Sequence, residues 1–149
     1  MTTRLDEVSV FGDKLRFLIP HEWVEGVAEE EDLYLYHAPD AESGWLRVSL
    51  ITVKTDKPPQ QRLQELFGKT SVVNEESGNL VETWEKESEE NGVPIHLYYW
   101  RVANAVPPNL VQEAVFSYTT LADRRGDQST REMVDLLDQL VGLATFVRQ

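Results

Sequence analysis

Leu15-Arg16-Phe17-Leu18-Ile19-Pro20-His21-Glu22-Trp23 is the part of the chain from which its folding pattern is best predicted. It indicates a short strand that ends at Pro20, because proline has no N–H to give to a sheet ladder. Trp23 is then expected to fold back and cover the end of the sheet with a large apolar ring. The stretch indicates a fold and carries no chemistry.

Alternating apolar and polar residues predict further strands on both sides of this stretch. Val8–Phe11 is expected to pair with residues 15–19 as a hairpin. Further strands are expected at residues 33–37, 45–53, 80–87, 95–103 and 110–121. Asn91-Gly92 is a tight-turn signal. Because short turns join the last three strands, they predict an antiparallel meander.

Two helices are expected. Pro58-Pro59 opens a short one, since proline is tolerated in a first helical turn, and Leu63, Leu66 and Phe67 share its apolar face. The second begins at Ser129-Thr130-Arg131-Glu132, which fits a capping box. Its apolar residues then recur at helical spacing as far as Val147. The predicted fold class is α+β: an antiparallel β-sheet with a short middle helix and a long C-terminal helix, in a single domain over residues 1–149.

Composition excludes several classes of partner. The 149 residues are 41% hydrophobic, which suits one globular core, and 26 acidic against 14 basic residues give a net charge of -12. Such a surface repels nucleic-acid phosphates and anionic membranes. No stretch approaches the roughly 20 apolar residues of a membrane span, and residues 1–7 lack the apolar run of a signal peptide. A cytoplasmic protein is expected.

No catalytic, metal-binding or cofactor-binding motif stands out. There is no cysteine, and the three histidines, His21, His37 and His96, lie far apart in the sequence without a metal-ligand spacing. Glu85, Glu87, Glu89 and Glu90 are interpreted as a solvated acidic face, since charged residues are seldom buried unless paired. We therefore expect no enzyme activity, no metal and no cofactor.

The row His96, Tyr98 and Trp100 is the candidate partner-binding site. On a strand these three side chains point to one face, about 7 Å apart at each step of two residues. If helices cover that face, the row belongs to the core, which is the favoured interpretation because large aromatic residues are mostly buried. If the face is open, the row is an apolar platform for a peptide or a partner helix.

The order of elements, together with the motif Phe17-x-Ile19-Pro20-x-x-Trp23, resembles the PsbP-like fold group. That group includes the extrinsic photosystem subunit PsbP, the Ran-binding Mog protein, DcrB-like proteins and effector-associated chaperones of type VI secretion. The resemblance covers nearly the whole chain. It implies an α/β sandwich whose members mostly bind proteins and rarely catalyse reactions.

Three hypotheses about function remain open. The first is a non-catalytic protein-binding module, a chaperone or adaptor that holds a partner segment against its sheet. It predicts an exposed apolar groove or patch on the sheet, and it is also compatible with a homo-oligomer. The second is a small-molecule-binding protein or cryptic enzyme with a START-like cavity, which predicts an internal pocket lined by aromatic residues. The third, a type III secretion chaperone, ranks last because residues 8–19 indicate strands where those proteins begin with a helix.

Overall fold

Antiparallel strand pairing organises most of the chain in a computed structural model that describes residues 4–27, 32–40, 44–67 and 71–147. The elements in chain order are β1 (Leu5–Val10), β2 (Leu15–Pro20), β3 (Val24–Glu25), β4 (Leu33–His37), β5 (Trp45–Lys54), α1 (Pro59–Leu66), β6 (Val72–Val73), β7 (Leu80–Glu90), β8 (Val93–Val106), β9 (Leu110–Leu121), the short 3-10 turn η1 (Ala122–Arg124), α2 (Gln128–Gly142) and β10 (Thr145–Phe146). The predicted α+β class is confirmed.

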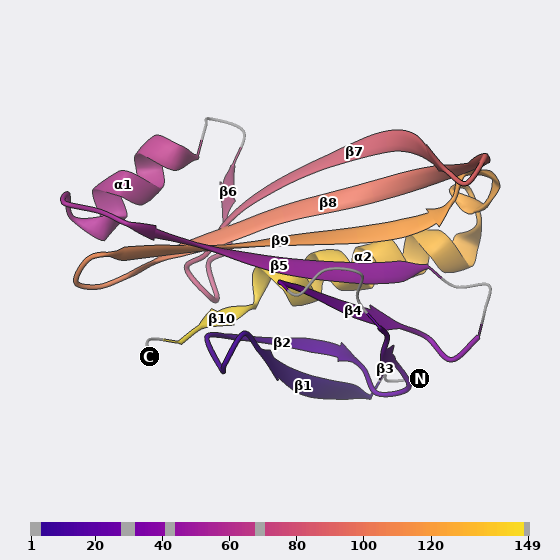
Figure 1. Ribbon diagram of the computed structural model, residues 1–149, viewed down its shortest axis with the longest axis horizontal. Coiled ribbons are helices and arrows are strands. Elements are labelled where there is room, and N and C mark those ends of the chain that lie inside the picture. The colour runs from indigo at the N-terminus through magenta and orange to yellow at the C-terminus, as the bar shows by residue number, and fades with distance from the viewer. Residues whose placement is uncertain (1–3, 28–31, 41–43, 68–70, 148–149) are drawn as a thin grey trace.

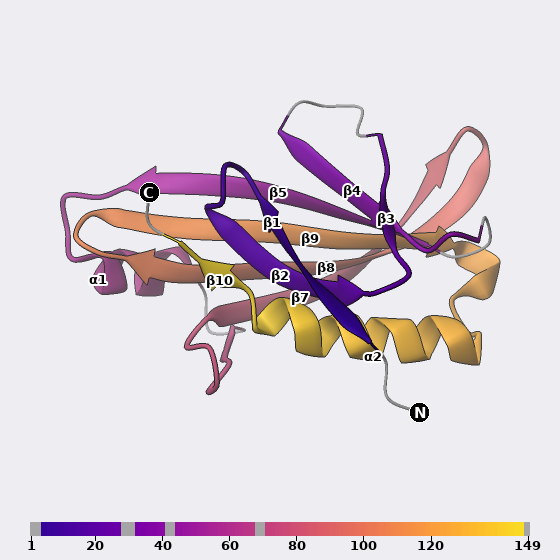
Figure 2. The ribbon, with the colours of Figure 1, turned by 90° about the horizontal axis from the view of Figure 1, so that it is seen from below.

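The strands form two sheets. The large sheet has seven strands in the order β3-β4-β5-β9-β8-β7-β6, and the small one has three in the order β1-β2-β10. Figures 1 and 2 show α2 and the small sheet on one face of the large sheet, here called the inner face, whereas α1 lies over one end of the opposite, outer face. The arrangement is a sandwich, as predicted.

The main core lies between the inner face and its cover. Trp100, Phe116 and Val48 stand side by side in one row of the large sheet, and all three are buried. Phe17 of the small sheet meets the Phe116 ring edge-on at 5.2 Å, and Leu137 of α2 belongs to the same cluster. Burial of this apolar surface is the main force that holds the layers together.

The N-terminal stretch folds as predicted. β2 ends at Pro20, and the backbone N–H of Trp23 donates to the Pro20 carbonyl over 3.0 Å. Trp23 is buried, and its ring lies nearly parallel to that of Tyr118 on β9, with centroids 6.2 Å apart. The tryptophan therefore covers the inner face where β2 ends.

The second half of the large sheet is the predicted meander. β7, β8 and β9 pair in sequence, antiparallel and residue for residue. Asn91 and Gly92 have positive φ angles of 54° and 81°, as a tight hairpin turn requires. β7 runs further than predicted, as far as Glu90, because the hairpin ladder continues through the charged residues beside the turn. β8 runs on to Val106 because its ladder with β9 continues to the pair Val106–Leu110.

Helix α1 covers only the end of the outer face. Leu63 and Phe67 pack on Leu80, Ala103 and Val111 as a second, smaller apolar cluster.

A buried ion pair adjoins this cluster. The Arg101 guanidinium lies 4.1 Å from the centre of the Phe67 ring and donates to both carboxylate oxygens of Glu113, over 2.5 and 3.2 Å. The hydrogen bonds that Arg101 donates to Glu113 raise the pKa of Arg101 above its usual value. The pair satisfies a carboxylate that is only 7% exposed.

Two predictions about the C-terminal helix are wrong. The helix begins at Gln128, with Asp127 at its N-cap and no side-chain capping bond, so Ser129 lies inside the first turn and the predicted capping box does not form. The helix also ends at Gly142 and not near Val147. Residues 145–146 instead form β10, which pairs with Leu15 and Arg16 of β2. The two-residue strands β3 and β6 were not predicted either, since they are too short to show a period.

Among the described residues, no helix is long and apolar enough to cross a lipid bilayer.

Candidate functional site

The predicted row on β8 lies on the inner face. Trp100 is 2% exposed and its indole N–H donates to Asp138 of α2 over 3.0 Å. His96 is 4% exposed and its Nε2 lies 2.7 Å from a carboxylate oxygen of Glu85. Tyr98 is half-buried, and burial raises the pKa of its phenol. Two members of the row thus belong to the core, and a binding role of the row stays a prediction.

The outer face carries the exposed aromatic residues. One row of this face runs Leu35, Arg47, Ser117, Tyr99 and Trp84 across five strands. At its end the Trp84 and Tyr99 rings stack, with centroids 5.0 Å apart and an interplanar angle of 5°. Trp84 is 41% exposed. An indole held flat on its neighbour and open to solvent is a preorganised contact surface.

The next row of the outer face ends in a second aromatic pair. It runs His37, Trp45, Thr119, Leu97 and Lys86. The His37 and Trp45 rings lie 4.3 Å apart, and Trp45 is 40% exposed. The central strand β9 thus offers small side chains between bulky ones on both sides.

A hollow of about 340 Å³ opens beside Trp45 on this face. It is lined by Val27, Leu33, Leu35, Trp45, Arg47, Glu90 and Thr119. Arg47 donates to the Thr119 hydroxyl over 3.1 Å, which holds a long polar side chain across the floor. We call the surface formed by Trp84, Tyr99, Leu97, Trp45 and Leu33 the outer-face patch. In Figure 1, α1 lies over only one end of this face, and no other helix of the described part of the chain lies on it.

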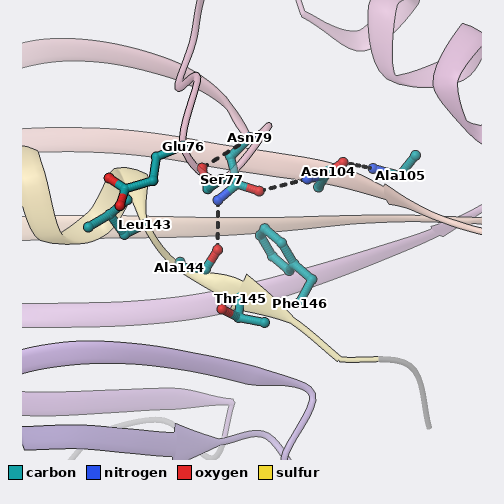
Figure 3. A pocket seen from close by; sticks show the side chains of 9 residues that line it. All are labelled: Glu76, Ser77, Asn79, Asn104, Ala105, Leu143, Ala144, Thr145 and Phe146. Atoms are coloured by element: carbon teal, nitrogen blue, oxygen red, sulfur yellow. Dashed lines mark hydrogen bonds between the residues drawn. The ribbon is translucent and has the colours of Figure 1, made fainter.

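A second hollow, of about 460 Å³, lies between the segment before β7 and the segment around β10 (Figure 3). Its wall contains Asn79, whose amide donates to the carbonyls of Gly142 and Ala144 and whose carbonyl accepts from Asn104. These bonds satisfy the Asn79 side chain within the protein. The hollow is lined mainly by polar and small residues, with Phe146 as its one aromatic residue. It therefore differs from the internal aromatic cavity of the small-molecule hypothesis.

A third hollow, of about 360 Å³, lies where β6, β7 and α2 meet. It is lined by Val72, Val73, Asn74, Val81, Thr83, Asp138 and Gly142. Val72 and Val73 are 68% and 54% exposed, so this edge of the large sheet is apolar at its β6 end.

The histidines stay apart. His21 lies beside Asp6 at 2.9 Å, His37 bonds the Ala38 carbonyl, and His96 bonds Glu85. Within the described ranges, no group of three or more histidine and carboxylate side chains is arranged to hold a metal ion.

The aromatic residues of the outer face were not singled out from the sequence, although the alternation on β8 contained a signal for them. The same alternation that puts Tyr98 and Trp100 on one face of β8 puts Leu97 and Tyr99 on the other. What the pattern lacked was the pairing of Trp84 with Tyr99, which depends on the β7–β8 register. Once Asn91-Gly92 fixes the hairpin, that register follows.

The sequence matches no known protein family and no curated protein. Solved structures do resemble it. A crystal structure from Bacteroides thetaiotaomicron has a TM-score of 0.61 at 16% identity, and the match covers 96% of this chain but only 48% of that one. LpqN, described as involved in cell envelope biogenesis of Mycobacterium tuberculosis, has a TM-score of 0.57 at 16% identity over 97% of this chain and 92% of its own.

The Ran-binding protein Mog1p of Saccharomyces cerevisiae also has a TM-score of 0.57, at 11% identity over 98% of this chain and 97% of its own. Mog1p and LpqN are members of the PsbP-like fold group. This chain therefore has the PsbP-like fold, as predicted, and at these identities the likeness defines the fold alone.

Proposed function

We propose that this protein is a non-catalytic protein-binding module, an adaptor or chaperone that holds a partner segment against the outer face of its large sheet. The observation that carries the proposal is the Trp84–Tyr99 stack, which stands open to solvent with a ring separation of 5.0 Å. Tryptophan and tyrosine are the residues most enriched among the energetic centres of protein interfaces.

The rest of the outer-face patch supports the same proposal. Trp45 is exposed to nearly the same extent as Trp84, and an open hollow lies beside it. A monomeric protein seldom leaves a contiguous apolar surface uncovered unless that surface binds something. The net charge of -12 favours basic partners.

The shared fold is in line with this proposal. Mog1p, whose architecture this chain has, is described as a Ran-binding protein. A protein or peptide partner is thus proposed here as well. The cytoplasmic location and the absence of enzyme activity expected from the sequence stay predictions.

The test is affinity capture from the native cells followed by mass spectrometry. The wild-type protein is compared with a Trp84→Ala/Trp45→Ala variant and with a control, Leu5→Ala, which removes an exposed apolar side chain from the small sheet. We expect a stoichiometric protein partner that the double variant loses and the control retains, with the circular dichroism of all three unchanged. A partner that the double variant retains would place the binding surface elsewhere, and capture of no partner would contradict a binding module.

A further inference from the structure

The outer edge of β7 is an unusually complete template for another strand. β6 pairs with β7 only at Val72–Val81 and Val73–Leu80. From residue 83 to residue 90 no described segment pairs with this edge. The opposite edge of β7 is paired with β8 without a bulge. The edge is therefore free of bulges over eight residues, or about 26 Å at 3.3 Å per residue.

The usual devices that blunt a sheet edge are largely missing here. Proline, bulges and very short strands protect most edges. β7 has eleven residues, none of them proline, and an unbroken ladder to β8. Its protection is charge alone, and along the side that faces α2 the charge has one sign.

That one-sided charge comes from Glu85, Glu87 and Glu89, which alternate with residues of the outer face. Glu85 and Glu87 lie beside His96 and Arg125, yet their side chains remain 60% and 71% exposed. Lys86 is the single cation of β7 and points to the outer face, in the row of Leu97. The unpaired edge of β7 and its row of carboxylates together favour the binding of an extended segment that carries positive charges.

The two flanks of the edge define the rest of the partner's pattern. Towards α2 the carboxylates would meet basic side chains at every second position. On the outer face the intervening side chains would lie beside Trp84, where an apolar residue continues the aromatic stack. At the β6 end the hollow lined by Val72, Val81 and Thr83 lies in line with this path.

A second copy of this chain does not fit the edge. Antiparallel pairing of two β7 edges would set the glutamates of one copy against those of the other, and like charges directly opposite are destabilising. We propose that the outer edge of β7 binds an extended segment of a partner protein by strand addition, and that this segment alternates basic and apolar residues. The inference rests on the proposed function and specifies its partner.

The test uses a blocked peptide, Arg-Val-Arg-Val-Arg-Val-Arg, titrated into the full chain at about 0.15 M ionic strength, where exposed charges more than about 8 Å apart are screened. Binding is followed by tryptophan fluorescence and by amide chemical shifts. Glu85→Gln/Glu87→Gln/Glu89→Gln is compared with Glu7→Gln/Glu22→Gln/Asp56→Asn, a control that changes the net charge equally at exposed sites elsewhere. We expect the edge variant to bind about tenfold more weakly, because each exposed ion pair contributes a few-fold in affinity, and the control to stay within about twofold of wild type.

Strand addition is separated from simple ion pairing by N-methylation of the peptide. Only alternate backbone amides of an added strand donate hydrogen bonds to the edge. The peptide methylated at residues 2, 4 and 6 and the peptide methylated at residues 3 and 5 should therefore differ in affinity. We expect one of them to lose binding and the other to keep it. Equal binding of both methylated peptides, equal weakening by the control variant, or no binding up to about 1 mM would overturn the proposal. If the peptide fails while capture of a Trp84-dependent partner succeeds, strand addition fails and the proposed function stands.

Discussion

The side-chain amide of Asn79 donates a hydrogen bond to the carbonyl of Ala144 over 2.7 Å and so ties the start of β7 to the last strand of the small sheet. The same amide donates to Gly142 at the end of α2. Asn79 is 1% exposed, so the two carbonyls that it satisfies have little access to water. This one side chain therefore bonds both the last residue of α2 and the residue just before β10.

Removal of Asn79 should therefore be costly. Asn79→Ala leaves the Ala144 carbonyl without its donor, removes one of the two donors to the Gly142 carbonyl and leaves the Asn104 amide without its acceptor. We expect a loss of about 3 kcal/mol in the free energy of unfolding. Ser77→Ala removes the bond that its hydroxyl donates to Gly142 and the longer bond that it accepts from the backbone N–H of Asn79, and it should cost about 1 to 2 kcal/mol. Urea denaturation measures both losses. Equal losses would contradict the central position given to Asn79.

The buried ion pair between Arg101 and Glu113 should matter far more than the exposed pairs. Arg101→Met leaves the Glu113 carboxylate buried without its cation, and we expect a loss of about 3 kcal/mol or more. Arg125→Met breaks an exposed pair with Glu87 and should cost less than about 1 kcal/mol. Chemical denaturation of the two variants is the measurement; a small effect of Arg101→Met would show that Glu113 reaches water.

Thr119 and Thr120 are adjacent and equally buried, but we expect their substitution by valine to change the stability of the fold in different ways. The Thr120 hydroxyl is buried and has no hydrogen-bond partner among the described residues, whereas the Thr119 hydroxyl accepts from Arg47. Thr120→Val should leave stability unchanged or raise it by up to about 1 kcal/mol, since the methyl group replaces an unpaired hydroxyl of similar size. Thr119→Val should lower stability by about 1 kcal/mol. Thermal unfolding of both variants decides between them.

The four tryptophans should divide into two pairs in acrylamide quenching. Trp45 and Trp84 are 40% and 41% exposed, against 7% for Trp23 and 2% for Trp100. Replacing Trp84 or Trp45 by phenylalanine should lower the fraction of quenchable fluorescence. Trp100→Phe should raise that fraction and also destabilise the fold, because it removes the bond to Asp138. A rise in quenchable fraction on losing Trp84 would contradict the exposed outer-face patch.

Stability should fall at alkaline pH through two buried tyrosines. Burial raises the pKa of both Tyr36 and Tyr118 above the usual value. The folded state therefore binds more protons than the unfolded state above about pH 10, so the stability that these phenols contribute is present below that pH and is lost as the pH rises. Tyr118→Phe should make the decline between about pH 9 and 11 shallower. An unchanged slope in denaturation experiments across that range would argue against the burial of this phenol.

The sequence alone determined the strand that ends at Pro20, the ring of Trp23 against the sheet, the hairpin at Asn91-Gly92 and the alternation that separates Tyr99 from Trp100. These features follow from local rules: a missing N–H, a positive φ and a period of two residues. The class of fold followed from their order.

Only the tertiary structure decided which face of the large sheet is covered. Alternation shows that the two faces differ but not which one α2 will pack upon. The burial of the row of His96, Tyr98 and Trp100 was therefore favoured only by the general rule that large aromatic residues are mostly buried. The end of α2 was likewise beyond local rules. The apolar spacing continues past Gly142, whereas the helix ends at that residue, whose carbonyl is bonded by Ser77 and Asn79 from more than sixty residues earlier in the chain. The open edge of β7 depends in the same way on a pairing that stops at β6, since a strand's own residues do not show what lies beside it.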